Sequence, residues 1–234
     1  MTGLDGTLCD IMSEVLEQVW SALGVALSPE DCCEYDLVRA FLPKVAHKLA
    51  SEELESCLRM HIWENPGVYR RLRPYWEVHQ AYQAWIKAGG GFVVLTARPT
   101  LPAVMGATQA WLEAWSYGGA GIYWARGYGG KRAAMAEIIR NLDYGAGASP
   151  EVWVAEDDPE QAADMADLLH TTSGVVDVIG TVYLMDRPWT RDCYGGLLKR
   201  RRLIQDIMDR IATHTEFSSP APSRLFQGND QQPG

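Results

Sequence analysis

Apolar residues recur at helical spacing over the first part of the chain. From Ile11 onwards they return every three or four positions, which predicts an amphipathic helix over residues 11–27. A Ser-Pro pair follows at 28–29 and is typical of a helix cap and a first turn. The same spacing continues to residue 62, so we expect short helices across residues 11–63.

The pattern changes further along, where short apolar runs alternate with helical stretches. Three consecutive glycines end the helix expected at 78–87, and the run from Phe92 to Leu95 is typical of a buried strand. The remaining expected elements are helix 108–115, strand 122–124, helix 131–142, strand 152–155, helix 159–169 and strand 178–184. Strands separated by helices of this length predict a parallel sheet with helices on both faces.

These patterns together predict an α/β fold, with a Rossmann-like three-layer core around a parallel sheet and an inserted helical cap. We assign the segments as follows: residues 1–10 and 76–196 to the core, 11–75 to the cap, 197–213 to a C-terminal helix, and 214–234 to a tail. The tail is polar and rich in proline, which is typical of disorder. The basic run at 199–202 is interpreted as a solvated helix start.

Composition narrows the classes of function. With 47% hydrophobic residues in 234, the chain can bury a core, and its formal net charge of -9 argues against binding nucleic acid. No apolar run reaches the ~20 residues of a membrane span, and no signal peptide pattern is present. The five cysteines have no zinc-like spacing. We therefore expect a cytoplasmic protein with reduced thiols and without nucleic-acid or membrane partners, and a homodimer is left open.

Residues that follow the expected strands are the candidates for chemistry, because open α/β sheets bind ligands at the carboxyl ends of their strands. Asp5 begins a Gly-Thr turn whose backbone can approach a ligand closely. Thr96 and Ala97 offer a hydroxyl and backbone N–H groups to phosphate oxygens. Lys131 stands at a helix start, where a cation is unfavourable without an anion partner. A turn, a helix cap and a surface lysine are the ordinary structural alternatives.

Three acids, Glu156, Asp157 and Asp158, directly follow the expected strand at 152–155. Neighbouring carboxylates repel one another unless a cation lies among them, and hard oxygen ligands suit Mg²⁺. Capping of the following helix accounts for one acid but not for three. We therefore favour metal binding over capping at this strand end.

The order of these motifs resembles the four motifs of the haloacid dehalogenase (HAD) superfamily of phosphatases. Finer matches, WENPGVY, LRP, VVLTARP, EDDPEQA and YLMDRPW, are similar to the 5'(3')-deoxyribonucleotidase family and its bacterial and phage relatives. The resemblance covers about residues 3–192. It implies a Mg²⁺-dependent phosphomonoester hydrolase that acts on nucleoside 5'-monophosphates through an aspartyl nucleophile, so the implied partner is a small-molecule nucleotide.

The resemblance also implies roles for individual residues. Asp5 matches the general acid and base beside the metal, and Thr96, Ala97 and Lys131 match the groups that hold phosphate. Asp5 and Asp157 match the metal ligands, with Glu156 or Asp158 as a supporting acid. Tyr69 and Trp63 match the cap aromatics that would receive the nucleobase. Packing within the cap is an equally good explanation of the two aromatic residues.

The chain departs from the family pattern at Gly3, which stands where the nucleophilic aspartate belongs. Glycine provides neither an attacking group nor a carboxylate for the metal. An alternative to the hydrolase is therefore an inactive relative that binds a nucleotide or phosphate through Thr96, Lys131 and Asp157. A shifted register with Asp5 as nucleophile is disfavoured, because the residues after Asp5 fit those that follow the second aspartate.

The first strand of such a fold lies in the middle of the sheet and needs about five residues. Only Met1 and Thr2 precede the first loop. Loss of a central strand leaves neighbouring backbone groups unpaired, which is costly. We therefore expect either an unusual repair of the sheet or a chain start placed too far downstream, and we favour the second.

Overall fold

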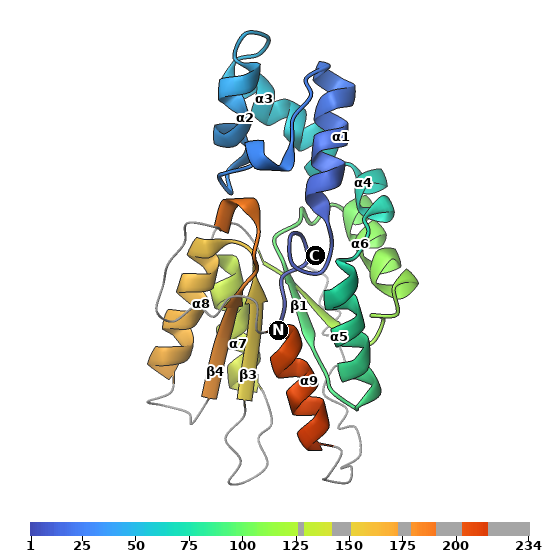
Figure 1. Cartoon of the computed structure of the whole chain (residues 1–234), viewed down its shortest axis with the longest axis vertical. Helices are drawn as coiled ribbons and strands as arrows, with labels where there is room; N and C mark the ends of the chain where they lie inside the picture. Colours follow the sequence, from blue (N-terminus) through green and yellow to red (C-terminus); the bar gives the residue numbers. More distant parts are fainter. Residues whose placement is uncertain (126–128, 142–150, 173–178, 191–202, 215–234) are drawn as a thin grey trace, which may run out of the picture.

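The computed structural model describes residues 1–125, 129–141, 151–172, 179–190 and 203–214 (Figure 1). It is an α/β fold in which the helices α1, α2 and α3 lie at one end of the molecule and the sheet lies nearer the other. No helix within the described ranges is both long enough and apolar enough to cross a membrane. The tail predicted at 214–234 lies, apart from His214, outside the described residues.

The sheet consists of two parallel strand pairs. β1 (Val93–Thr96) pairs with β2 (Gly121–Trp124), and β3 (Glu151–Glu156) pairs with β4 (Ile179–Leu184). Thr2 forms parallel bridges to both β1 and β3, so it joins the two pairs in the order β2, β1, Thr2, β3, β4. All four strands predicted from the sequence are present, each within two residues of its expected bounds.

Residues Met1 to Gly3 fill the middle of the sheet. The Thr2 N–H donates to the Val93 carbonyl over 2.9 Å, and the Thr2 carbonyl accepts from the Leu95 N–H over 2.8 Å. On the other side, the Gly3 N–H donates to Ala155 over 2.7 Å, and the Ala155 N–H donates to Met1 over 3.1 Å. Backbone hydrogen bonds on both sides of Met1 to Gly3 therefore pair β1 and β3 with this segment at this level of the sheet.

Alternation along the strands separates two apolar layers. Val93 and Leu95 of β1 pack with α7 and α8, whereas Val94 belongs to the cluster that includes α5 and α9. These four helices are α5 (Trp76–Lys87), α7 (Gly130–Asn141), α8 (Pro159–Thr172) and α9 (Leu203–His214). Helices therefore cover both faces of the sheet, as the predicted three-layer core requires.

The cap consists of short helices, as its spacing predicts. They are α1 (Ile11–Leu23), a 3-10 turn (Pro29–Asp31), α2 (Leu37–Val45), α3 (Ser51–Leu58), a π-helical turn (Arg59–Trp63) and α4 (Pro66–Arg71). Asp10 accepts from the Ser13 N–H and caps α1, and Gly24 ends it in a left-handed conformation. The chain returns to the core through α4, which packs against α6 (Pro102–Ala114). A further 3-10 turn spans Pro188–Thr190.

Candidate active site

The loop after Gly3 folds tightly against the end of β3. Its closing hydrogen bonds run from the Leu8 and Cys9 N–H groups to the Leu4 carbonyl, over 2.9 and 3.0 Å. Gly6 has φ 69°, and a Cβ at this position would lie 2.0 Å from Asp157 Oδ2. Only glycine fits such a close approach in this conformation. The Gly-Thr turn thereby brings the first motif onto the acids that follow β3.

Asp5 is held by Arg98, a residue of the VVLTARP motif to which the sequence analysis gave no role. Arg98 Nε donates to Asp5 Oδ2 over 2.8 Å and Nη2 to Oδ1 over 2.5 Å. The guanidinium also donates to Thr108 over 2.9 Å and lies over the Tyr69 ring. Burial disfavours its charge, but the Asp5 carboxylate more than offsets this and raises the pKa of Arg98. Asp5 is therefore paired on both of its oxygens.

Lys131 at the start of α7 has the anion partner that its position demands. Its Nζ donates to Glu156 Oε2 over 2.7 Å, and both side chains are buried. Burial favours the neutral amine, but the carboxylates of Glu156 and Asp157 outweigh it and raise the pKa of Lys131. Glu156 thus neutralises the lysine that was predicted to hold phosphate.

The two remaining acids of the strand end have different environments. Asp158 Oδ1 accepts from the Glu160 and Gln161 N–H groups over 2.9 and 3.3 Å, so it caps α8. Asp157 is buried, and burial together with the neighbouring Glu156 charge raises its pKa well above the ordinary value. Capping of α8 therefore accounts for Asp158, whereas the ionised form of Asp157 is disfavoured in its surroundings.

The space beside Gly3 is filled from β3. A Cβ at Gly3 would lie 3.1 and 3.3 Å from the two carboxylate oxygens of Glu156, and 2.9 Å from Thr7 Oγ1. Thr7 Oγ1 is buried and has no hydrogen-bond partner among the described residues. A side chain at residue 3 would therefore meet a carboxylate that is already in place, and Thr7 retains a free hydroxyl at this point.

One cavity of about 910 Å³ lies between the cap and the ends of the strands. Its core wall includes five of the predicted residues, Asp5, Thr96, Ala97, Lys131 and Asp157. Its cap wall includes Trp63, Leu58 and Arg59. Tyr69 lies outside this lining, because it is buried beneath the Arg98 guanidinium and its hydroxyl donates to the Trp63 carbonyl over 2.8 Å. Glu156 is also absent from the cavity lining, but it accepts a hydrogen bond from Lys131, which lines the cavity.

Arg187 is a second residue whose role the sequence analysis did not identify, although it lies in the YLMDRPW motif. Its Nε donates to the Gly6 carbonyl over 2.5 Å, and its guanidinium lies 3.6 Å from the centre of the Tyr75 ring. Its Nη2 is buried and has no hydrogen-bond partner among the described residues. Arg187 therefore holds the first loop in place although it lies 181 positions away in the sequence. Its contact with Gly6 forms only in the folded chain.

The predicted metal ligands do not form a closed metal site. Among the described residues, no three His, Cys, Asp or Glu side chains are grouped so that they can hold an ion. Asp5 and Glu156 are bonded to Arg98 and Lys131 instead. Asp157, whose pKa is raised, fits a cation as a single hard oxygen ligand. Mg²⁺ is commonly held by one or two carboxylates together with substrate phosphates and water, so one such ligand is compatible with it.

The fold corresponds to a HAD-like α/β fold. Among solved structures, the chain is similar to a HAD family hydrolase from Deinococcus radiodurans R1 that was crystallised with bound phosphate and sodium. The TM-score is 0.54 at 13% identity, over 92% of this chain and 94% of that one. No protein-family model matches the chain, and no curated protein matches it. At this identity the likeness establishes the fold.

Proposed function

We propose that the chain is a phosphomonoester hydrolase of the HAD type that acts on nucleoside 5'-monophosphates. The observation that carries this proposal is the single cavity in which Asp5, Thr96, Lys131 and Asp157 meet below the cap residue Trp63. These residues come from four separate parts of the sequence. The phosphate in the similar HAD family hydrolase is consistent with phosphate binding by this fold.

The phosphate group would bind at the core wall of the cavity. Lys131 supplies a buried positive charge, and the backbone after β1 supplies N–H groups near Thr96. The opposite wall carries Trp63, whose ring provides a stacking surface for a nucleobase. The volume is in the range that accommodates a small ligand.

Asp5 is the base in this proposal, and water is the nucleophile. Gly3 has no attacking group, and Glu156 is fully buried against Lys131. Arg98 holds the carboxylate of Asp5 in place at the cavity wall, where it can accept a proton from a water molecule beside the phosphate. The water oxygen forms the new bond to phosphorus as its proton passes to Asp5. The ester P–O bond breaks, and the nucleoside oxygen receives the proton from Asp5.

In this proposal Asp157 would hold Mg²⁺ as a cofactor. When bound, it would neutralise charge on the transferring phosphoryl group. The raised pKa of Asp157 supports this assignment, because it reports a buried carboxylate with too little positive charge around it.

A phosphatase assay with a panel of nucleoside monophosphates, with Mg²⁺ or with a chelator, tests the proposal. Asp5→Asn is expected to reduce kcat by about 100-fold or more, as loss of a general base does. The control Asp209→Asn makes the same chemical change at an exposed position on α9 and should leave kcat within twofold. Unchanged turnover in Asp5→Asn would overturn the role of Asp5. Absence of turnover in the unmodified chain with every substrate would overturn the hydrolase.

Binding without hydrolysis is the second candidate function, and the Arg98 pair favours it. Both oxygens of Asp5 are already bonded to the guanidinium, so the base must share its lone pairs with a strong partner. Calorimetric titration with a nucleoside monophosphate separates the two candidates. Binding that is lost in Lys131→Met while no product forms in the unmodified chain supports the binding protein. Measurable product formation supports the hydrolase.

A further inference from the structure

Arg187 connects the end of β4 to the first loop, residues 4–9, which carries Asp5. Its Nε donates to the Gly6 carbonyl over 2.5 Å, and a charged donor forms a stronger hydrogen bond than a neutral one. The guanidinium keeps this position although its buried Nη2 has no hydrogen-bond partner among the described residues. An unpaired buried donor is unfavourable, so the interactions of Arg187 beyond its own turn have to compensate for it.

Gly6 lies directly against the Asp157 carboxylate. A Cβ at Gly6 would lie 2.0 Å from Asp157 Oδ2, so even a methyl group at this position would overlap the carboxylate. The first loop is therefore packed on the acid that would hold Mg²⁺ in the proposed function. A shift of the loop would move Asp5 relative to Asp157, and the Gly6 carbonyl is the point at which Arg187 opposes such a shift.

The turn that begins at Arg187 also holds the backbone of Asp157. Trp189 Nε1 donates to the Asp157 carbonyl over 2.9 Å, and the Trp189 side chain is buried. The Arg187 N–H donates to Thr190 Oγ1 over 2.9 Å, which closes the turn. In Figure 1 this turn is the orange segment that follows β4, on the side of the sheet that faces α1 and α2. One short segment therefore holds both the first loop and the acid on which the loop is packed.

The linkers between the cap and the core support Arg187 from the other side. Its guanidinium lies over the Tyr75 ring, 3.6 Å from the ring centre, and a cation is attracted to the face of an aromatic ring. Tyr75 belongs to the linker that returns from the cap, where its N–H donates to the Leu8 carbonyl over 3.0 Å. The Asp10 N–H of the outgoing linker donates to the Arg73 carbonyl over 2.8 Å. The paired linkers therefore fix the ring on which Arg187 rests.

We propose that Arg187, supported by the Tyr75 ring, is a positioning residue that holds the first loop against Asp157 through the Gly6 carbonyl. Arg187 is absent from the lining of the 910 Å³ cavity, so it acts through the loop and does not contact a bound phosphate. The effect on turnover rests on the proposed function, whereas the effect on the order of the loop does not. A displacement of a catalytic group by about 1 Å can reduce a rate by roughly 100-fold.

Amide hydrogen exchange measures whether Arg187 holds the loop, whether or not the chain is an enzyme. The Leu8 and Cys9 N–H groups donate to the Leu4 carbonyl within the loop. In Arg187→Met these two amides should exchange about 10-fold faster or more, while the amides that pair β1 with β2 keep their rates. Arg187→Lys retains a charged donor and should keep most of the protection. Unchanged exchange in the loop, or faster exchange in all elements alike, would overturn the proposal.

Tyr75 offers a matched pair of variants, because one keeps the ring beneath Arg187 and the other removes it. Tyr75→Phe loses only the 3.4 Å hydrogen bond to Asp10 and should leave exchange in the first loop within twofold. Tyr75→Leu should increase this exchange, but not further in a chain that already carries Arg187→Met. Independent, additive increases in the double variant would overturn the support of Arg187 by the ring.

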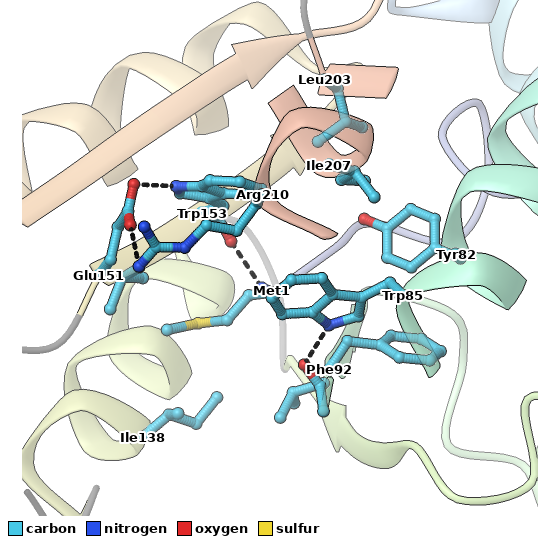
Figure 2. A pocket seen from close by; sticks show the side chains of 13 residues that line it. Met1, Tyr82, Trp85, Phe92, Ile138, Glu151, Trp153, Leu203, Ile207 and Arg210 are labelled. Atoms are coloured by element: carbon cyan, nitrogen blue, oxygen red, sulfur yellow. Dashed lines mark hydrogen bonds and ion pairs between the residues drawn. The ribbon is translucent and has the colours of Figure 1, made fainter. Parts of the chain in front are cut away.

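Kinetics and calorimetry separate positioning from a general structural role. With the nucleoside monophosphate that the unmodified chain hydrolyses fastest, Arg187→Met should lower kcat by about 10- to 100-fold. KM, and the Kd for inorganic phosphate, should stay within about threefold. The control Arg210→Met removes an ion pair with Glu151 at the opposite end of β3 (Figure 2) and should leave kcat within twofold.

The outcomes of these experiments are distinguishable. Faster exchange in the loop of Arg187→Met with an unchanged kcat would overturn the positioning role. Absence of turnover in the unmodified chain would refute the hydrolase, and the exchange rates of the Arg187 and Tyr75 variants would then decide by themselves whether Arg187 holds the loop.

Discussion

Acetylation of the Met1 α-amine is expected to remove a pH-dependent loss of stability. The amine lies between β1 and β3 and is partly buried, and it donates to the Trp153 carbonyl over 2.6 Å (Figure 2). Burial lowers its pKa from 8.0 to about 5, because the charged amine loses its hydration there. The folded chain therefore holds a neutral amine at neutral pH, whereas the unfolded chain holds a largely protonated one.

The size of this effect follows from the linkage between protonation and folding. As the pH falls below 8.0, the unfolded chain takes up a proton that the folded chain accepts only near pH 5. The contribution of the neutral amine to the free energy of unfolding is therefore complete above pH 8. It is lost progressively as the pH falls to about 5. At about 1.4 kcal/mol for each pKa unit, the full change is ~4 kcal/mol.

Urea unfolding of the unmodified and acetylated chains at pH 8 and pH 5.5 measures this difference. An acetylated amine does not titrate in this range and keeps its N–H for the Trp153 carbonyl. Between the two pH values the unmodified chain should lose about 3 kcal/mol more than the acetylated chain. All other titrating groups are common to both chains and cancel in the comparison. Equal pH dependence in the two chains would refute the placement of the amine in a dry site.

Three further predictions concern the 910 Å³ cavity that is lined by Asp5, Thr96, Lys131 and Asp157. Gly3→Asp should lower the unfolding free energy by about 1–3 kcal/mol, because its Cβ would lie 3.1 Å from a Glu156 oxygen. It should not increase turnover, and a gain in kcat would contradict this. Arg98→Met should cost about 2–3 kcal/mol in urea unfolding, because Asp5 loses a buried partner; unchanged stability would show that the pair is dispensable. Inorganic phosphate and Mg²⁺ should raise Tm together by more than the sum of their separate effects, and strict additivity would argue against Asp157 as the shared site.

The secondary structure could be predicted because its signals are local. The strand expected at 152–155 spans Glu151–Glu156, since an apolar run bounded by turns identifies a buried strand from a few residues. The first helix ends at Leu23, before the expected residue 27, because Gly24 adopts φ 62° and closes the helix. The bridges of Thr2 to β1 and β3 could not be foreseen, because isolated backbone bridges leave no periodic pattern.

The sequence could predict which residues of the site follow the strands. It could not predict which of these residues form ion pairs with one another. Spacing predicted Lys131 at a helix start in need of an anion, but the identity of that anion, Glu156, depends on how the start of α7 meets the end of β3. Arg98 and Asp5 are separated by 93 positions in the sequence, and their bond depends on the order of the strands. Asp158 illustrates a competing local effect, because its carboxylate caps α8.

Under the proposed function, the charges around this cavity favour a phosphate group that enters together with a cation. Arg98 neutralises Asp5 and Lys131 neutralises Glu156, so each cation must share its bonds before it can hold an added anion. Asp157 contributes a further buried carboxylate, whose raised pKa shows that its ionised form is disfavoured as the site stands. A phosphate dianion would disfavour that ionised form still more. A divalent cation between Asp157 and the phosphate would relieve both, so a site without three preformed ligands remains consistent with cation-assisted phosphate chemistry.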